Sequence, residues 1–347
     1  MRLPAPAAVD LPASVRLPYY RDAAELPGPL PTQAEIHDAA SELDSADGYC
    51  KESDGGMGVI RGTYFAKFGP HVTENEGNAL LFIEKHLDIP APRLYAMYRD
   101  YSSGYLYMIT EYARGVGLDM VWGILSTGAK SSISMQLKHI FWRMRSLSPP
   151  PAFIGGVAGG GLPDPFFHTE NPDPSINGPF RTAEEVGSAI ALRSRRVSEE
   201  NGKREWQSGF LSRNLAAALK DHEVVFTHGD LTMRNIVVEK VPAGEPDVKW
   251  NYRVKCIVGW DSAGWYPAYW EYASAILNND INMPKDDMPE GDMPESDWPE
   301  VVDTIFTPHP LELSMIALVL EGLRIDESTD SSDSPKEYYD RRVRYWG

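Results

Sequence analysis

Two short apolar segments, Val224–Phe226 and Ile236–Val238, enclose a polar run that reads His228-Gly229-Asp230-Leu231-Thr232-Met233-Arg234-Asn235. Apolar runs of this length are typical of buried β-strands, so the polar run is expected to form the loop between them. The loop places the Asp230 carboxylate five residues before the Asn235 carboxamide. A carboxylate can accept a proton from a hydroxyl group, and a carboxamide oxygen can ligate a hard cation such as Mg²⁺. The pair predicts a reacting centre on a loop between two strands.

The composition is that of an ordinary globular chain, with 347 residues, of which 42% are hydrophobic and 24% charged. This length provides one large or two moderate domains. The net charge of −17 disfavours nucleic acid and anionic membranes as partners, because both need positive surface. It would suit a cationic small molecule, although solubility is the preferred explanation. Cys50 and Cys256 are too few for a disulfide framework, which indicates a reducing compartment.

The sequence has no pattern typical of a membrane helix or of a secretory signal. No apolar run approaches the ~20 residues that a membrane helix needs. The best candidate, Leu311–Leu323, is short and contains Glu312 and Glu321. Residues Met1–Ala13 are rich in proline and lack the basic and apolar regions of a secretory signal. The sequence therefore predicts a cytoplasmic protein without a membrane partner.

Local patterns predict strands in the first part of the chain. The alternation around Gly62 suits a hairpin, and the prolines of Ile89–Pro92 must end any helix before them. The segment before about Ala46 is rich in proline and alanine and is expected to be an extended or partly ordered arm, with regular structure beginning near Gly48. The expected elements are a hairpin over Gly58–Phe68, a helix over Glu74–His86, and strands over Leu94–Tyr98 and Tyr105–Glu111.

The later part of the chain reads mostly as helix. Helices are expected over Met135–Leu147, from a capping box at Thr182 to about Ser194, from about Glu205 to Lys220, and over Leu311–Leu323, with a further strand over Val254–Val258. The glycines and prolines of Ile154–Asn177 predict a long loop, either functional or an insertion. Strands followed by helices predict an α+β fold with two lobes, and a ligand site between them.

The loop is one of a series of motifs that follow one another along the chain. The series comprises Lys67 in F-A-K-F-G, Glu76 in E-G-N-A-L, Ile89-Pro90-Ala91-Pro92, Ile109-Thr110-Glu111-Tyr112, the loop His228–Asn235, the run Ala263–Tyr272 and Asp297-Trp298-Pro299-Glu300. In this order they resemble the aminoglycoside/choline kinase-like phosphotransferases, the fungal-type members in particular, over about Gly48 to Leu323. Each motif is weak by itself, but their order predicts the two-lobed protein-kinase-like fold, with a small N-terminal antiparallel sheet lobe and a larger helical lobe. A fold alone does not give a function.

The resemblance implies roles for three loop residues. Asp230 would accept the proton of a substrate hydroxyl group, and Asn235 would ligate Mg²⁺. His228 belongs to the same candidate catalytic loop, where it is expected to hold the loop rather than act as an acid or base. Thr232 stands where many protein kinases have a lysine, which favours a small-molecule substrate over a protein.

The resemblance also implies a cofactor site for ATP. Lys67 would contact the α- and β-phosphates, held in place by an ion pair with Glu76, and backbone groups at Glu111 and Ala113 would bond the adenine. Lys67 could instead be an ordinary solvated lysine, but the downstream loop favours the ion pair. The implied division is an arm over residues 1–46, a nucleotide-binding lobe over 47–113, a catalytic and substrate lobe over 114–325 and a charged tail over 326–347.

Gly259 departs from the family pattern. In Ile257-Val258-Gly259-Trp260-Asp261, position 259 is where the resemblance implies an Asp that ligates Mg²⁺. If the segment is extended, Asp261 faces the same side roughly 7 Å away, and a bend could bring it inward as a replacement ligand. The favoured alternative is that Asp261 keeps the place of the acidic residue that follows the Trp in the family. Loss of the ligand is expected to lower the rate of phosphoryl transfer by orders of magnitude.

Two further segments allow a phosphate-binding interpretation. The glycines Gly55, Gly56, Gly58 and Gly62 could cover phosphates, but their spacing misses the G-x-G-x-x-G motif and a hairpin turn is preferred. The D-M-P-E repeats at Asp287–Glu290 and Asp292–Glu295 include a D-D-x-x-E string that could bind Mg²⁺–diphosphate on a helix. Prolines interrupt that helix, so a solvated acidic loop is preferred.

Aromatic residues gather just after Gly259. Trp260, Trp265, Tyr266, Tyr269 and Trp270 lie within eleven positions of one another. Most are expected to form the core of the second lobe, and one or two could line an aromatic substrate cleft.

Two hypotheses of different classes follow. The first is an ATP- and Mg²⁺-dependent phosphotransferase that acts on a hydroxyl group of a small molecule, with a cationic molecule as one option and no nucleic-acid partner. The second, motivated by Gly259, is a catalytically degraded kinase-like protein that binds a ligand or performs non-phosphoryl chemistry in a biosynthetic pathway, as in secondary metabolism.

Overall fold

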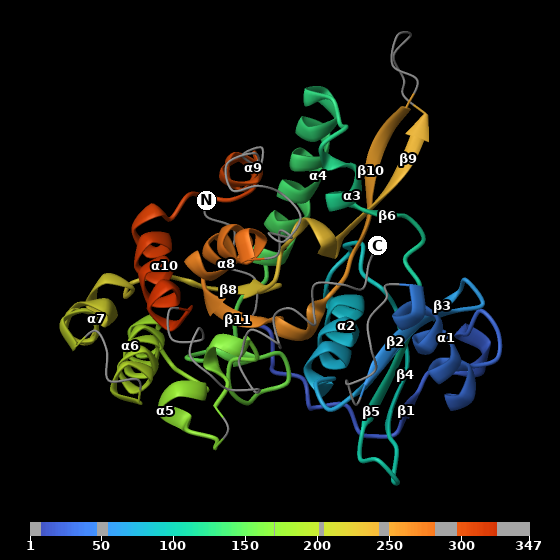
Figure 1. The fold of residues 1–347 in the computed structure, drawn as a ribbon, viewed down its shortest axis with the longest axis horizontal. Helices are drawn as coiled ribbons and strands as arrows, with labels where there is room; N and C mark the ends of the chain where they lie inside the picture. The colour runs from blue at the N-terminus through green and yellow to red at the C-terminus, as the bar shows by residue number, and fades with distance from the viewer. Residues whose placement is uncertain are drawn as a thin grey trace.

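Five antiparallel strands form a sheet in the first part of the chain (Figure 1). The structure is a computed structural model that describes residues 8–46, 55–169, 171–200, 205–242, 250–281 and 297–324. The strands lie in the order β1-β4-β5-β3-β2, with the bounds β1 Tyr19–Tyr20, β2 Gly56–Ile60, β3 Tyr64–Gly69, β4 Leu94–Arg99 and β5 Leu106–Glu111. The expected hairpin and the two expected strands are confirmed.

A helix covers each face of this sheet. Alternate residues of a strand point to opposite faces, and β5 is buried on both. Its Met108 belongs to the apolar cluster of α2 (Glu74–His86), and its Ile109 belongs to the cluster that contains Ile36 of α1 (Gln33–Ala46). Helix α2 has the bounds that periodicity and the downstream prolines predicted.

The segment before Asp47 is more regular than the sequence predicted. Strand β1 pairs with β4, and the 3₁₀ turn η1 (Ala23–Glu25) and helix α1 follow it. The expectation that regular structure begins near Gly48 is therefore wrong. A capping box opens α1, because the Glu35 N–H donates to Thr32 Oγ1 (3.3 Å) and the Thr32 N–H donates to the Glu35 carboxylate (2.9 Å). This T-x-x-E motif is visible in the sequence, but the apolar stripe that follows it is weak.

The glycines of the first hairpin serve the turn and close packing. Arg61 and Gly62 have φ values of 55° and 60° and are the two left-handed central residues of a turn in which the Thr63 N–H donates to the Ile60 carbonyl oxygen (3.1 Å). On β2, a Cβ atom at Gly58 would lie 2.7 Å from the Ala39 side chain of α1. Of the four glycines for which a turn was preferred, Gly62 lies in the turn, whereas Gly56 and Gly58 lie on β2, where the close approach of α1 accounts for them.

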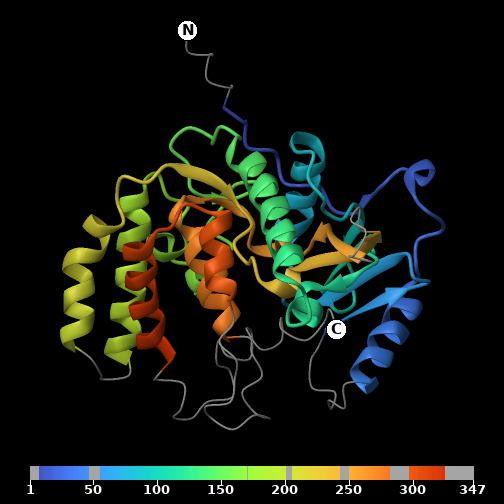
Figure 2. The ribbon, with the colours of Figure 1, turned by 90° about the horizontal axis from the view of Figure 1, so that it is seen from above.

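Helices make up most of the second part of the chain (Figures 1 and 2). They are α3 Leu118–Trp122, α4 Thr127–Arg145, α5 Pro174–Asn177, α6 Ala183–Glu200, α7 Glu205–Ala218, α8 Tyr269–Ile281, α9 Trp298–Ile305 and α10 Pro310–Arg324. The 3₁₀ turns are η2 Pro165–Phe167, η3 Met233–Asn235 and η4 Trp260–Ser262. Figure 2 shows α6, α7 and α10 side by side at the end of the molecule far from α1.

Two small sheets lie among these helices. One has the order β10-β9-β6 and the other the order β7-β11-β8. Their strands are β6 Val116–Gly117, β7 Gly155–Gly156, β8 Val224–Thr227, β9 Ile236–Pro242, β10 Trp250–Ile257 and β11 Gly264–Pro267. Because β8 and β9 belong to different sheets, the polar loop that joins them lies where the two sheets meet.

The helices predicted for the second part are confirmed. The segment Ile154–Asn177, predicted as a long loop, contains the short elements β7, η2 and α5. The acidic repeats at Asp287–Glu290 and Asp292–Glu295, and the tail over 326–347, lie outside the described residues. Among the described residues, none of the helices has the length and apolar character to cross a membrane.

Candidate active site

The loop His228–Asn235 connects β8 to β9, as predicted. Gly229 has a φ of 84°, in the left-handed region that favours glycine. A Cβ atom at this position would also lie 2.7 Å from the Ser262 carbonyl oxygen. Conformation and space therefore both require glycine at the bend between strand and loop.

A buried carboxylate holds the start of this loop. Glu271 of α8 is 1% exposed and accepts hydrogen bonds from the backbone N–H groups of His228 (2.6 Å) and Gly229 (3.3 Å). Burial raises the pKa of Glu271 to about 7, against the opposing effect of these two donors and of Arg145. Glu271 thus ties the loop to α8 across more than forty residues of sequence.

The His228 side chain uses both ring nitrogens to position the loop. Its Nε2 atom donates to the Val258 carbonyl oxygen (2.9 Å), and its Nδ1 atom accepts from the Asp230 N–H (3.2 Å). The ring is fully buried and lies edge-on against Trp260. These contacts fit the expected role of holding the loop, and they leave the imidazole poorly placed for proton transfer.

The side chains of Asp230 and Asn235 contact each other in the loop. The Asn235 side-chain amide donates to the Asp230 carbonyl oxygen (2.7 Å) and to its Oδ2 atom (2.9 Å). The second carboxylate oxygen, Oδ1, accepts from the amide of Asn278 on α8 (3.0 Å). Both oxygens of the half-buried Asp230 carboxylate are therefore oriented by amide donors. Farther along the loop, Arg234 forms an ion pair with Asp119 of α3 (3.5 Å).

Gly259 lies directly against the Asn235 carboxamide. The glycine has φ 78° and ψ 47°, a left-handed conformation that other residues rarely adopt. A Cβ atom there would lie 2.9 Å from Asn235 Oδ1 and 3.0 Å from its Cγ atom. Gly259 and the Asn235 carboxamide form the corner where the resemblance implied an Asp. Gly259 contributes no side-chain oxygen to this corner, and in the present arrangement the corner has no space for a side chain.

The segment after Gly259 bends, so it does not have the extended geometry considered for Asp261. Residues Trp260–Ser262 form the 3₁₀ turn η4, in which Asp261 is half-buried. Asn75 of α2 fixes this turn, because its side-chain amide donates to the carbonyl oxygens of Asp261 (2.9 Å) and Ala263 (2.8 Å). The turn is thereby coupled to the helix that carries Glu76. A metal-ligand role for Asp261 stays a prediction.

The predicted ion pair between β3 and α2 is present. The Lys67 ammonium group contacts the Glu76 carboxylate, and the side chains are 16% and 9% exposed. Glu74, the competing partner two residues earlier, pairs instead with Arg99 (2.9 Å). The helical offset between positions 74 and 76 accounts for this choice, because the two side chains project from different faces of α2.

The segment after β5 brings the first lobe against the second. The Glu111 N–H donates to the Arg93 carbonyl oxygen (2.9 Å), so the candidate adenine-bonding group at that residue is its carbonyl, which also accepts from Thr110 Oγ1 (3.4 Å). Ala113 is buried in a small apolar cluster with Val237 of β9, Cys256 of β10 and Val258. This cluster forms an apolar patch beside the backbone that was predicted to bond the adenine.

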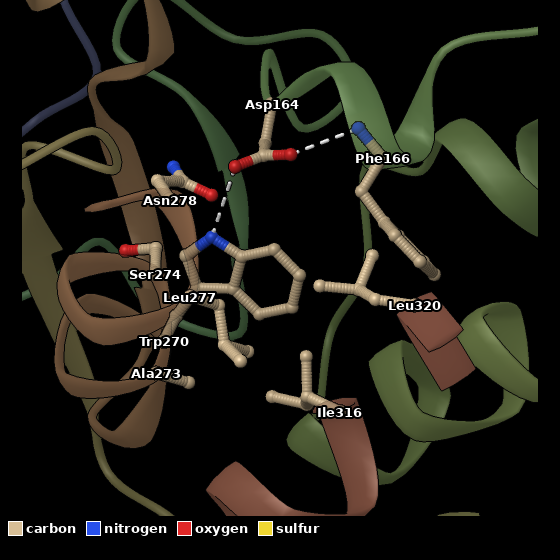
Figure 3. Close-up of a pocket in the computed structure, with 9 residues that line it drawn as sticks. All are labelled: Asp164, Phe166, Trp270, Ala273, Ser274, Leu277, Asn278, Ile316 and Leu320. Atoms are coloured by element: carbon tan, nitrogen blue, oxygen red, sulfur yellow. Dashed lines mark hydrogen bonds between the residues drawn. The ribbon is translucent and has the colours of Figure 1, made fainter. Parts of the chain in front are cut away.

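A narrow pocket opens next to the Asp230 loop (Figure 3). It is lined by Asp164, Phe166, Trp270, Ala273, Ser274, Leu277, Asn278, Ile316 and Leu320. Figure 3 shows the polar groups of Asp164, Ser274 and Asn278 along one side and aliphatic side chains along the other. Because Asn278 also bonds Asp230, the pocket adjoins the carboxylate. Trp270 lines it, and the other four aromatic residues of the predicted group are buried core.

Solved structures with the same architecture are aminoglycoside phosphotransferases. The ternary complex of APH(2")-IIa with streptomycin and ATP is 10% identical, with a TM-score of 0.50 over 90% of this chain and 96% of that chain. A thermostable mutant of aminoglycoside phosphotransferase APH(4)-Ia in its apo form is 12% identical, with a TM-score of 0.46 over 88% and 97%. No family model and no curated protein matches the sequence.

The fold is that of the aminoglycoside phosphotransferases. At 10% identity the likeness establishes the architecture and no more. It agrees with the predicted α+β fold of a small antiparallel sheet lobe and a larger helical lobe.

Three polar residues of this site were not assigned a role from the sequence. Glu271 lies within a run of aromatic residues. The feature of the sequence that could have revealed its role is a single carboxylate on the apolar face of a helix. Asn75 precedes Glu76, and Asn278 lies two turns after Glu271 on α8. Neither asparagine has a local pattern that reveals its partner, because the partners lie 48 or more positions away.

Proposed function

We propose that the protein transfers a phosphoryl group from ATP, with Mg²⁺, to a hydroxyl group of a small molecule. The observation that carries this proposal is the fixed Asp230 carboxylate. Asn235 and Asn278 orient its two oxygens, while Glu271 and His228 hold the backbone beneath it. A rigidly placed carboxylate on such a loop suits a general base that accepts the proton of the attacking hydroxyl group.

The donor set beside Asp230 fits a magnesium ion in part. The Asn235 amide nitrogen donates to Asp230, so its Oδ1 atom is the group available to a cation. Mg²⁺ is commonly bound through few protein oxygens, with waters and substrate phosphates completing the octahedron. The ion would supply neutralisation of charge on the transferring group. Gly259 adds no ligand, so we expect Mg²⁺ to be held mainly by the nucleotide.

Lys67 is proposed to position the ATP phosphates. Its ion pair with Glu76 fixes a flexible ammonium group at the edge of the sheet lobe, where phosphate oxygens can reach it. The backbone at Glu111 and Ala113 is proposed to bond the adenine, beside the apolar cluster of Ala113. These assignments make residues 47–113 the nucleotide-binding lobe and residues 114–325 the catalytic and substrate lobe.

The acceptor is proposed to enter through the pocket beside Asn278. The pocket volume is about 20 Å³, little more than one water needs, so an acceptor would insert one group and lie mostly outside. The Trp270 ring and the Asp164 carboxylate line this pocket. An aromatic face and a carboxylate both attract cations, which supports a cationic acceptor.

The decisive experiment is a phosphotransfer screen with purified protein. Wild-type protein, Mg²⁺ and ATP labelled at the γ-phosphate are offered to a panel of amino alcohols, aminoglycosides and other hydroxylated amines. We expect a labelled product that Asp230→Ala abolishes and that Asp38→Ala, an exposed change on α1, leaves intact. Absence of any product and of any ATP binding would overturn the proposal.

A second function is favoured by the geometry at Gly259. At position 259 the Asn235 carboxamide occupies the space that a carboxylate side chain would need. A protein that no longer transfers phosphoryl groups would tolerate this arrangement. In that case the fold would bind a ligand or perform non-phosphoryl chemistry. A thermal-shift titration separates the two functions, because a ligand of the native state raises Tm. A shift with ATP that does not depend on Mg²⁺ supports the second function, and one that requires Mg²⁺ supports the first.

A further inference from the structure

Two histidines and a glutamate converge where the loop before β8 meets the start of α10. His222 precedes β8, His309 immediately precedes α10, and Glu312 lies in the first turn of α10. One ligand atom from each of the three side chains lies within 4.8 Å of the other two. The side chains are 12–18% exposed, so the group is sheltered yet still reachable from solvent.

An ion pair alone does not account for this group. His222 Nε2 lies 3.0 Å from Glu312 Oε1, as in an ordinary hydrogen bond. His309 Nδ1 lies 3.9 Å from the other carboxylate oxygen, too far for a hydrogen bond. Two ligands of one tetrahedral Zn²⁺ ion, each bound at about 2.0–2.1 Å, are roughly 3.3 Å apart. Small side-chain rotations would bring all three atoms to that spacing.

Tyr269 provides a second, independent indication of a ligand. Its side chain is fully buried, and its hydroxyl group has no hydrogen-bond partner among the described residues. Its ring lies edge-on against His222, with centroids 4.8 Å apart. A buried hydroxyl group without a partner costs free energy, and a metal-bound water would satisfy it.

We propose that His222, His309 and Glu312 bind a zinc ion that ties the start of α10 to the loop preceding β8. Two imidazoles and a carboxylate form a donor set that suits zinc, with a fourth position left for a water bonded by Tyr269. The site is separate from the Asp230 loop and does not depend on phosphoryl transfer.

The test is a zinc titration of the full chain, freed of any histidine tag and of bound metal, without nucleotide. We expect one Zn²⁺ per chain and a rise in Tm of several degrees. His309→Gln and Glu312→Gln should each weaken zinc binding by about 100-fold or more, and Tyr269→Phe by about tenfold, as for loss of an outer partner. The matched controls His139→Gln and Glu199→Gln, both exposed, should bind zinc as the wild type does.

Cobalt substitution tests the geometry even if a variant fails to fold. Wild-type protein with Co²⁺ should show the strong visible absorption of a four-coordinate ion, which added Zn²⁺ removes. Retention of wild-type affinity in His309→Gln and Glu312→Gln would overturn the proposal. So would a weak six-coordinate cobalt spectrum, or the absence of zinc binding.

Discussion

The loop at Asp230 and the corner at Gly259 both contact the Asn235 side chain, and they are held in different ways. The loop is fixed by side chains from a distant helix, with Glu271 under its backbone and Asn278 on the carboxylate. The corner has a left-handed glycine and no side-chain oxygen. Under the proposed function, this difference would give a rigid proton acceptor at Asp230 and leave a cation to be held by neutral oxygens and the nucleotide.

The largest expected effect is that of a substitution in the loop, at Asp230. Asp230→Ala removes the proton acceptor, and we expect the phosphotransfer rate to fall by about 10²–10⁴-fold at every Mg²⁺ concentration. Asn235→Ala removes the oxygen nearest the corner and should instead raise the Mg²⁺ concentration needed for half-maximal activity. Steady-state rates measured over a range of Mg²⁺ concentrations distinguish the two. Identical Mg²⁺ profiles for both variants would show that the two sides of the site do not have separate roles.

A pH effect tests the buried carboxylate beneath the loop. Burial raises the folded-state pKa of Glu271 from 4.5 to about 7, so the folded protein holds this proton more tightly than the unfolded chain does. The stabilisation is therefore complete below about pH 4.5 and is lost as the pH rises through about 7. At ~1.4 kcal/mol per pKa unit, the free energy of unfolding should fall by on the order of 2–3 kcal/mol across this range.

Urea unfolding of wild type and Glu271→Gln over this pH range measures the effect. The glutamine side chain does not titrate, so the difference between the two curves isolates Glu271. Glu199→Gln, an exposed change on α6, should reproduce the wild-type profile. Parallel curves for wild type and Glu271→Gln would show that the carboxylate titrates normally.

The glycine corner is tested by a pair of substitutions. Gly259→Ala places a Cβ atom against Asn235 in a left-handed backbone, and we expect a loss of about 1–3 kcal/mol in the free energy of unfolding. Gly259→Asp places a Cβ atom at the same point, so any effect on Mg²⁺ dependence beyond that of Gly259→Ala comes from the added carboxylate group. Gly259→Asp should lower the Mg²⁺ concentration needed for ATP binding relative to Gly259→Ala, as followed by thermal shift. Equal Mg²⁺ dependence would mean that the corner is not a metal position.

The smallest expected effect concerns the contact between α2 and the turn after Gly259. Asn75→Ala removes two hydrogen bonds to backbone carbonyl oxygens, and we expect a loss of about 1–2 kcal/mol in the free energy of unfolding. Asn214→Ala on the exposed face of α7 is the control, with an expected change within about 0.5 kcal/mol. If the two variants are equally stable, Asn75 does not couple α2 to the turn.

Local patterns predicted the elements whose causes lie within a few residues. The hairpin depends on the turn at Arg61 and Gly62, and the bounds of α2 depend on its apolar spacing and the prolines after it. The loop between β8 and β9 was predicted because apolar strands flank its polar residues. Helix α1 was missed, although its capping box is local, because it packs on β2 through only a few small and apolar side chains such as Ile36.

The sequence by itself determined most strands of the first sheet, the main helices of the second part, the two-lobed architecture, the ion pair of Lys67 with Glu76 and the presence of Asp230 and Asn235 on one loop. Tertiary structure alone decided that Glu271 lies beneath that loop, that Asn278 orients the carboxylate and that Gly259 is closed against Asn235. The physical reason is the separation in sequence over which each kind of interaction acts. Turn chemistry and hydrophobic periodicity act between near neighbours in sequence, whereas buried polar partners are selected by whichever distant groups the packed core brings within hydrogen-bond distance.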